Sequence, residues 1–115
     1  MKTRLVVRAL IERAGLALVN ETKNGARLLG GRVKKDETLQ EALERELLEE
    51  IGCRNIIGQV VNVTERRRKS MREITFTFKA IVFGDPVSHE KQIKLGWVKR
   101  AEICGWPNTI NFQAA

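Results

Sequence analysis

Three glutamates, Glu46, Glu49 and Glu50, are the side chains of this sequence whose type and spacing are best suited to chemistry. Spacings of three and four residues bring side chains onto one surface of a helix, so these carboxylates are expected to lie close together. Crowded carboxylates repel one another, and burying any of them without a partner costs free energy. Mg²⁺ takes oxygen ligands and commonly bridges protein carboxylates to substrate phosphates. The three glutamates therefore predict a site for a hard divalent cation.

The helix that would carry these glutamates is predicted to run from about Thr38 to Ile51. Thr38 and Glu41 have the spacing of a capping box, which begins a helix. Gly52 follows the last apolar position and is a residue type that commonly ends one.

Two of the glutamates are expected to be partly buried. On a helical wheel Glu46 and Glu50 fall inside the apolar stripe of the predicted helix, and Glu49 lies on its edge. The apolar stripe consists of Leu39, Ala42, Leu43, Leu47 and Ile51. A solvated acidic face is the usual interpretation of a glutamate-rich helix, and the position of these two acids disfavours it.

The glutamates belong to a longer pattern with many fixed positions. Gly31 is followed after five residues by Glu37, and after seven more by the run RELLEEIGC from Arg45 to Cys53. This pattern resembles the signature of the Nudix hydrolase family. Because so many positions match within one continuous segment, the resemblance is specific, whereas a pair of adjacent glutamates alone would indicate little.

The resemblance implies a fold of the α/β (α+β) class, an α/β/α sandwich with a mixed β-sheet and a loop–helix–loop signature. It implies hydrolysis of a pyrophosphate bond in a nucleoside diphosphate linked to another group, with Mg²⁺ or Mn²⁺ as cofactor. The metal ligands would be Glu46, Glu49, Glu50 and the carbonyl of Gly31. Candidate substrates are a (d)NTP, ADP-ribose, a nucleotide sugar and a dinucleoside polyphosphate.

Other positions of the signature receive supporting or catalytic roles from the same resemblance. Glu37 and Arg45 would form a salt bridge that holds the loops to the helix, and Gly52 would end the helix. The general base would be one of the signature glutamates, or an acid from outside the signature, Glu73 or Glu90. Each of these last two is alternatively an ordinary solvent-facing glutamate.

Several residues near the signature are candidates for substrate binding. Lys34 and Lys35 add positive charge where many Nudix proteins have an acidic residue, and Arg32 precedes them. Such charges would stabilise negative charge that develops on phosphate oxygens. Trp97 is a candidate for base stacking, and a packed core tryptophan is the alternative. Leu29 stands where relatives often have proline.

Composition predicts a single globular domain, residues 1–115, in the cytoplasm. The chain is 43% hydrophobic, has a net charge of +7 and contains two cysteines without metal-ligand spacing. No apolar stretch is long enough to cross a membrane, and the first residues lack the layout of a signal peptide. The positive charge favours binding to polyanions, so a nucleotide-derived substrate and RNA are both candidate partners.

Alternating apolar residues and turn signals predict six strands. They are Arg4–Ile11, Leu16–Val19, Ala26–Leu29, Ile56–Thr64, Glu73–Phe83 and Lys94–Val98. The fifth is expected to be central and covered on both faces near its end, because Ile81 and Phe83 add apolar side chains to its polar face.

Residues 65–72, ERRRKSMR, are predicted to form a solvated hairpin loop. A loop that contacts phosphate is the alternative, although no aromatic residue interrupts the charges to stack on bases.

The segment after Ile103, CGWPNTINFQAA, predicts no amphipathic helix, whereas Nudix domains usually end with a helix packed on the sheet. A homodimer would cover the face that this helix usually occupies, and an unusually short domain is the alternative.

Two competing functions come from the same residues. A non-catalytic Nudix-like module would bind a nucleotide or RNA without cleaving it, and an RNA 5′-end pyrophosphohydrolase would use the basic segment. The complete set of metal-binding acids favours an enzyme, because a binding module does not need all of them.

Overall fold

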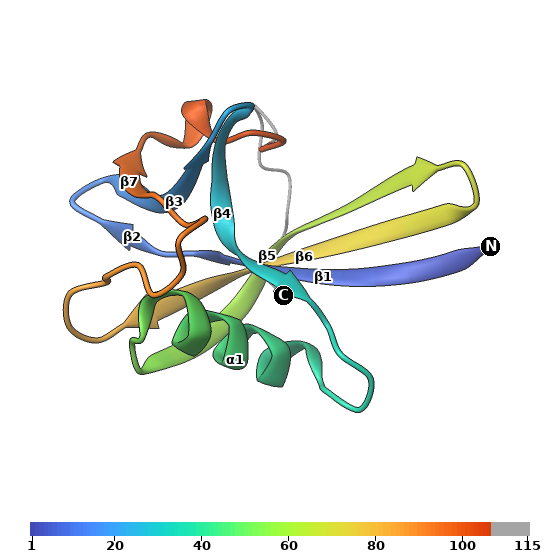
Figure 1. Cartoon of the computed structure of the whole chain (residues 1–115), viewed down its shortest axis with the longest axis horizontal. Helices are drawn as coiled ribbons and strands as arrows, with labels where there is room; N and C mark the ends of the chain where they lie inside the picture. The colour runs from blue at the N-terminus through green and yellow to red at the C-terminus, as the bar shows by residue number, and fades with distance from the viewer. Residues whose placement is uncertain (107–115) are drawn as a thin grey trace.

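The computed structural model describes residues 1–106, in which a seven-stranded mixed β-sheet packs against one α-helix (Figure 1). The strands are β1 (Lys2–Leu10), β2 (Glu12–Arg13), β3 (Leu16–Thr22), β4 (Gly25–Arg32), β5 (Asn55–Arg68), β6 (Met71–Val82) and β7 (Leu95–Val98). The helices are α1 (Leu39–Ile51) and a short 3₁₀ helix, η1 (Arg100–Glu102). The mixed sheet and the position of α1 confirm the predicted fold class.

Strand β1 organises the sheet. It pairs antiparallel with β4 on one side and parallel with β6 on the other, and the order continues as β2-β3-β4-β1-β6-β5. β7 pairs with β3. The register opposes Arg8 to Gly30 and Val7 to Gly31, so the glycines of the signature lie directly beside the middle of β1.

Helix α1 has the ends that the sequence predicts. The hydroxyl of Thr38 accepts a hydrogen bond from the backbone N–H of Glu41, and the Glu41 carboxylate accepts one from the N–H of Thr38. Gly52 ends the helix at φ 65°, a left-handed conformation that costs glycine little. These caps fix where the acidic residues of α1 begin and end.

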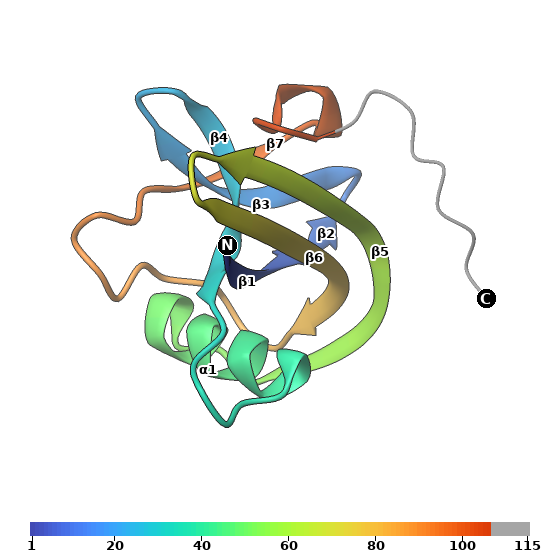
Figure 2. The same cartoon turned by 90° about the vertical axis from the view of Figure 1, so that its right-hand side faces the viewer.

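The apolar face of α1 packs against one face of the sheet. The cluster between them contains Val7, Ala9, Ile11, Leu18, Leu29, Ala42, Leu43, Leu47, Ile51, Cys53, Ala80 and Val82. A second cluster on the opposite side consists of Leu10, Ala17, Val19, Leu28, Val61 and Ile103, with Trp106 packed against it. Figure 2 shows α1 on one side of the sheet and η1 on the other.

The prediction of a basic hairpin loop over residues 65–72 is wrong. β5 continues to Arg68 and β6 begins at Met71, so Lys69 and Ser70 alone make the turn. Register pairs run from Thr64 and Thr75 out to Arg68 and Met71. The strands extend away from the body of the protein as a long arm beside the start of β1 (Figure 1). Pairing between the two backbones continues there although the side chains are charged.

The predicted covering of both faces near the end of β6 is also wrong. Ile81 is 61% exposed and Phe83 is 52% exposed, whereas Ala80 and Val82 on the other face are buried. β6 does have a neighbour on each side, β1 and β5. The helix covers only one face of the sheet at this point, and nothing in the described part of the chain covers the second.

Several predicted strands are longer in the structure. β3 reaches Thr22, and β4 runs from Gly25 to Arg32, so Gly30 and Gly31 belong to a strand and do not follow it. β2 is an additional short strand. The prediction about a final helix falls mostly on residues 107–115, which lie outside the described residues. Among residues 1–106, no helix is long and apolar enough to cross a membrane.

Candidate active site

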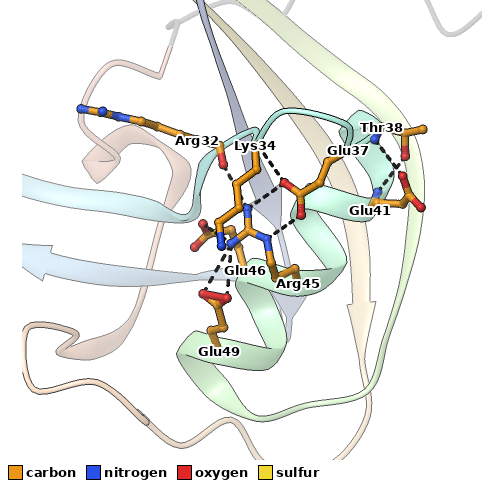
Figure 3. Close-up of polar contacts among 8 residues, drawn as sticks. All are labelled: Arg32, Lys34, Glu37, Thr38, Glu41, Arg45, Glu46 and Glu49. Carbon is orange, nitrogen blue, oxygen red and sulfur yellow. Dashed lines mark hydrogen bonds and ion pairs between the residues drawn. The ribbon is translucent and has the colours of Figure 1, made fainter.

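Arg45 is the centre of a hydrogen-bond network that joins α1 to the signature loop, residues 33–38 between β4 and α1 (Figure 3). Its guanidinium donates to both carboxylate oxygens of Glu37, at 2.6 and 2.9 Å, and to the carbonyl of Arg32 at 3.1 Å. It also donates to Glu46 at 2.9 Å and to Glu49 at 3.3 Å. The Glu37–Arg45 salt bridge implied by the resemblance is therefore present, and Arg45 holds two of the acidic side chains in place.

Glu37 is strongly stabilised as a carboxylate. The hydrogen bonds from Arg45 and from the backbone N–H of Lys34 lower its pKa to about 2. The same network raises the pKa of Arg45 above its usual value. Two-point contact between a guanidinium and a carboxylate fixes the relative orientation of the two groups as well as their distance.

We expect the Glu37–Arg45 pair to make stability depend on pH below pH 5. Because the pKa of Glu37 is lower in the folded protein than in the unfolded chain, its stabilisation is complete above about pH 4.5 and is lost as pH falls towards 2. Glu37→Gln should flatten this part of the profile, measured as melting temperature against pH. Asp85→Asn, at an exposed acid of the loop after β6, would serve as a control, and an unchanged slope in Glu37→Gln would contradict the assignment.

Glu50 is the buried acid of the helix, with a side chain on the same surface as Glu46. Burial, followed by the negative charge of Glu46, raises the pKa of Glu50 to about 8. The backbone N–H of Gly30 donates to its carboxylate at 3.1 Å, and Arg8 also favours the ionised form. A buried carboxylate beside a second one creates a local need for positive charge.

Gly31 allows the carboxylate of Glu46 to lie against β4. A Cβ atom at this position would come within 2.5 Å of Glu46 Oε1, well inside contact distance. At the neighbouring Gly30, with φ 144°, a Cβ would come within 2.0 Å of the carbonyl oxygen of Val7. Gly31 thus makes room for the carboxylate of Glu46, and Gly30 allows the close approach of two strands.

These two glycines provide a matched pair of substitutions. Gly31→Ala should displace Glu46 and lower kcat by about tenfold to a hundredfold, because small misplacements of catalytic groups are costly. The melting temperature should change little, since the clash is with the end of a flexible side chain. Gly30→Ala should instead destabilise the fold by about 2 kcal/mol or more, because both backbone conformation and space are wrong. Equal loss of stability in both variants would contradict this distinction.

An arginine-lined pocket of about 440 Å³ lies next to Gly31. Its lining residues come from β1, β4, β5 and β6 and are Arg4, Val6, Arg8, Arg27, Gly31, Arg32, Arg66, Arg68, Met71 and Glu73. Arg8 is largely buried, and burial lowers its pKa while the charge of Glu50 opposes that shift. The pocket therefore places a strongly positive surface beside the acidic residues of α1.

A smaller pocket of about 120 Å³ continues from the first and shares Arg8, Arg27, Arg66 and Glu73 with it. Its other lining groups are Leu28 of β4, polar side chains of β5 and β6, and residues that follow η1. The last two groups are Asn62, Thr64, Thr75, Thr77, Ile103, Cys104, Gly105 and Trp106. The two pockets together give a continuous depression that is positive at one end and has hydroxyl, amide and indole groups at the other.

Of the two candidate general bases outside the signature, Glu73 lines this depression and Glu90 does not. Glu73 lines both pockets and accepts a hydrogen bond from Arg4 at 3.4 Å. Glu90 lies in the loop after β6, hydrogen-bonded to Gln92, and its charge adds to the rise in the pKa of Glu50. The loop is joined to the end of α1, because the N–H of His89 donates to the carbonyl of Glu50 at 2.9 Å.

The substrate-binding candidates predicted from the sequence do not all line the same pocket. Arg32 lines the arginine-lined pocket, whereas Lys34 and Lys35 line an adjoining depression that shares Arg4, Arg32 and Met71 with that pocket. Trp97 lies on β7 with the guanidinium of Arg13 5.9 Å from its ring centre, and it does not line the arginine-lined pocket. Trp106, for which the sequence predicts no role, lines the smaller pocket.

Arg66 and Arg68 belong to the basic segment for which phosphate contact was the alternative prediction, whereas Arg4, Arg8 and Arg27 were not predicted as site residues. One signal was available, because Arg8 interrupts an otherwise apolar run in β1 and a charge in such a position needs a partner or a function. Arg66 and Arg68 alternate with Arg67, which indicates one face of a strand only if residues 65–68 are recognised as a strand.

We call Glu46, Glu49 and Glu50 of α1 the acidic site. It suits a hard cation, because three carboxylates and the backbone carbonyl groups of the neighbouring strand β4 supply oxygen ligands. The raised pKa of Glu50 is a second observation in favour of a cation there. Glu46 and Glu49 are bound to Arg45 in this structure, and within residues 1–106 no three acidic, histidine or cysteine side chains form a ready-made metal cage.

Comparison with known proteins identifies this combination of fold and signature. A model of the NUDIX domain matches residues 2–114 of the chain. The solution structure of the E. coli ORF135 protein is similar with a TM-score of 0.78 and 29% identity, over 93% of this chain and 81% of that one. Comparison with curated proteins gives no match.

Two further solved structures share the fold. A MutT NUDIX hydrolase from Burkholderia pseudomallei has a TM-score of 0.77 and 22% identity, over 96% of this chain and 92% of that one. An ADP-ribose pyrophosphatase from Streptococcus suis has a TM-score of 0.70 and 18% identity, over 93% of this chain and 84% of that one.

The mixed sheet, its one α-helix and the match to the NUDIX domain model together indicate a class of nucleotide pyrophosphohydrolases. The chain belongs to that class, the Nudix hydrolase family. It is thus an enzyme of a family that generally uses a divalent metal and acts on nucleotide substrates.

Proposed function

We propose that this protein hydrolyses a pyrophosphate bond in a nucleoside diphosphate linked to another group, with Mg²⁺ or Mn²⁺ as cofactor. One observation carries the proposal: Glu46 and buried Glu50 lie against Gly30 and Gly31, at the edge of the arginine-lined pocket. Carboxylates that bind a cation and arginines that bind phosphate are thereby placed on adjoining surfaces. We also propose that residues 1–115 act as one domain.

The residues of the signature have distinct tasks in this proposal. Glu46, Glu49, Glu50 and the carbonyl of Gly31 would hold the cation, and Arg45 positions Glu46 and Glu49 before the cation binds. A bound divalent cation supplies positive charge to phosphate oxygens and makes a water molecule more acidic. Glu37 acts through Arg45 and does not touch the substrate.

The arginines contribute a second source of positive charge. Arg8 and Arg32 line the pocket next to Gly31, so they would bind the phosphate chain and stabilise the charge that develops on it during hydrolysis.

We propose Glu73 as the acid that takes a proton from the attacking water, because it lines the pocket and Glu90 does not. Glu73→Gln should then abolish the fall in rate on the acid side of the pH–rate profile. If that part of the profile is unchanged, Glu73 is not the general base.

The experiment that tests the proposed function is a hydrolysis screen with Mg²⁺ or Mn²⁺. Substrates would include (d)NTPs, ADP-ribose, nucleotide sugars, dinucleoside polyphosphates and 5′-triphosphorylated RNA, with products identified by chromatography. We expect at least one substrate to be cleaved at a pyrophosphate bond. No cleavage of any substrate, together with nucleotide binding detected by thermal shift, would instead support a non-catalytic binding module.

A further inference from the structure

The arm formed by β5 and β6 contributes two side chains to the arginine-lined pocket. Arg66 and Arg68 line the pocket, together with Met71 and Glu73 from the paired strand. Arg67 does not line it, which follows from the alternation of side chains along a strand. The opposite face of the arm carries an ion pair between Glu65 and Arg72 at 3.1 Å.

The pocket contains far more positive than negative charge. Its lining includes six arginines and a single acid, Glu73, which is paired with Arg4. Within the described part of the chain, no carboxylate lies within 4.0 Å of the guanidinium groups of Arg27, Arg32, Arg66 or Arg68. Like charges held this close favour an anion that neutralises several of them at once.

The position of the arm relative to the acidic site indicates which part of a substrate it would bind. Gly31 and Arg32 form the side of the pocket next to Glu46, and Arg66 and Arg68 come from the protruding arm on another side. A phosphate chain whose cleaved bond lies near Glu46 would reach the arm only with phosphates beyond that bond. A nucleotide sugar carries about two negative charges and a triphosphate about four, so only the longer chain has charge for the arm.

We propose that Arg66 and Arg68 are specificity-determining residues that bind phosphates beyond the cleaved bond. They would select nucleotides with three or more consecutive phosphates over nucleoside diphosphates linked to an uncharged group. This inference rests on the proposed function. In the reaction, the oxygen of water bonds to one phosphorus and the bridging P–O bond breaks. The released phosphate chain keeps the bridging oxygen, and the proton of water passes to the Glu73 carboxylate and from there to solvent.

The arm provides its own control for a test by substitution. We would measure kcat/KM of wild-type protein, Arg66→Ala/Arg68→Ala and Arg67→Ala on a nucleoside triphosphate, a dinucleoside tetraphosphate, ADP-ribose and a nucleotide sugar. The double variant should lose about a hundredfold on the first two substrates and less than about threefold on the others. Arg67→Ala should stay within about twofold of wild type on all four.

A conservative variant and a binding measurement complete the test. Arg66→Lys/Arg68→Lys should recover part of the lost kcat/KM, because lysine restores charge without two-point geometry. Equal losses on all substrates, or an equal effect of Arg67→Ala, would overturn the inference. Calorimetry with inorganic tripolyphosphate separates it from the proposed function. Tighter binding to wild type than to the double variant would support the arm's role even if nothing is hydrolysed, and equal binding would refute it.

Discussion

Glu50→Gln is expected to lower kcat by about three orders of magnitude while the protein remains folded. Glutamine keeps the size of the side chain and can still accept the hydrogen bond from the N–H of Gly30. It removes the negative charge that would hold the cation. The measurement is steady-state hydrolysis of whichever substrate the screen identifies, with circular dichroism and melting temperature recorded on the same samples.

The matched control for this substitution is Glu44→Gln on the same helix. Glu44 contacts Gln40 at 3.4 Å and has no contact with the acidic site or with Arg45. Its loss should leave kcat within about twofold of wild type, since changes at surface positions of this kind have small effects. Near-normal turnover in folded Glu50→Gln would exclude Glu50 from the catalytic machinery.

Removal of divalent cations is the second change with a large expected effect. A chelator should abolish hydrolysis, and added Mg²⁺ or Mn²⁺ should restore it. The physical reason is that Glu46, Glu49 and buried Glu50 place three carboxylates together, and the nearby charges of Arg45 and Arg8 leave the pKa of Glu50 raised. Full activity in chelator would show that the reaction proceeds without a cation.

Thermal unfolding gives an independent reading of the same site. A cation that binds only the folded protein stabilises it by about 2.7 kcal/mol at a hundred times its Kd. Wild-type protein should therefore melt at a higher temperature with Mn²⁺ than in chelator. Glu50→Gln should show a much smaller shift, and an equal shift in both proteins would place the cation elsewhere.

The helix and its acidic residues were predictable because their signals are local in sequence. Thr38, Glu41 and Gly52 define the two ends of α1, and the wheel places Glu50 inward, where the structure has it 7% exposed. Glu49, predicted at the edge of the stripe, is about half exposed. Caps and helical periodicity depend on neighbours within one or two turns, so the sequence contains them in full.

The arginine-lined pocket was not predictable in the same way. Arg4 and Arg8 come from β1, Arg27 from β4, and Arg66 and Arg68 from β5, and only the pairing register of the sheet brings them together. No local pattern in the sequence contains that register.

The arm illustrates a different limit. Strand prediction relies on apolar alternation, and residues 65–68 are charged on both faces, so the segment was interpreted as a loop. Backbone pairing with residues 71–74 determines its conformation instead. Ile81 and Phe83 show the opposite limit. Their side chains are apolar, which predicted burial, but both are exposed in the structure.

Direct titration of Mn²⁺ tests the central claim that the signature acids form the catalytic cation site. Electron paramagnetic resonance of free Mn²⁺ would give the affinity of wild-type protein and of Glu50→Gln, and the rate of hydrolysis would be measured at each concentration. We predict that activity follows Mn²⁺ occupancy in wild type. The affinity of Glu50→Gln for Mn²⁺ should be lower by about tenfold or more. Equal affinity in the two proteins, or activity that does not follow occupancy, would contradict the account.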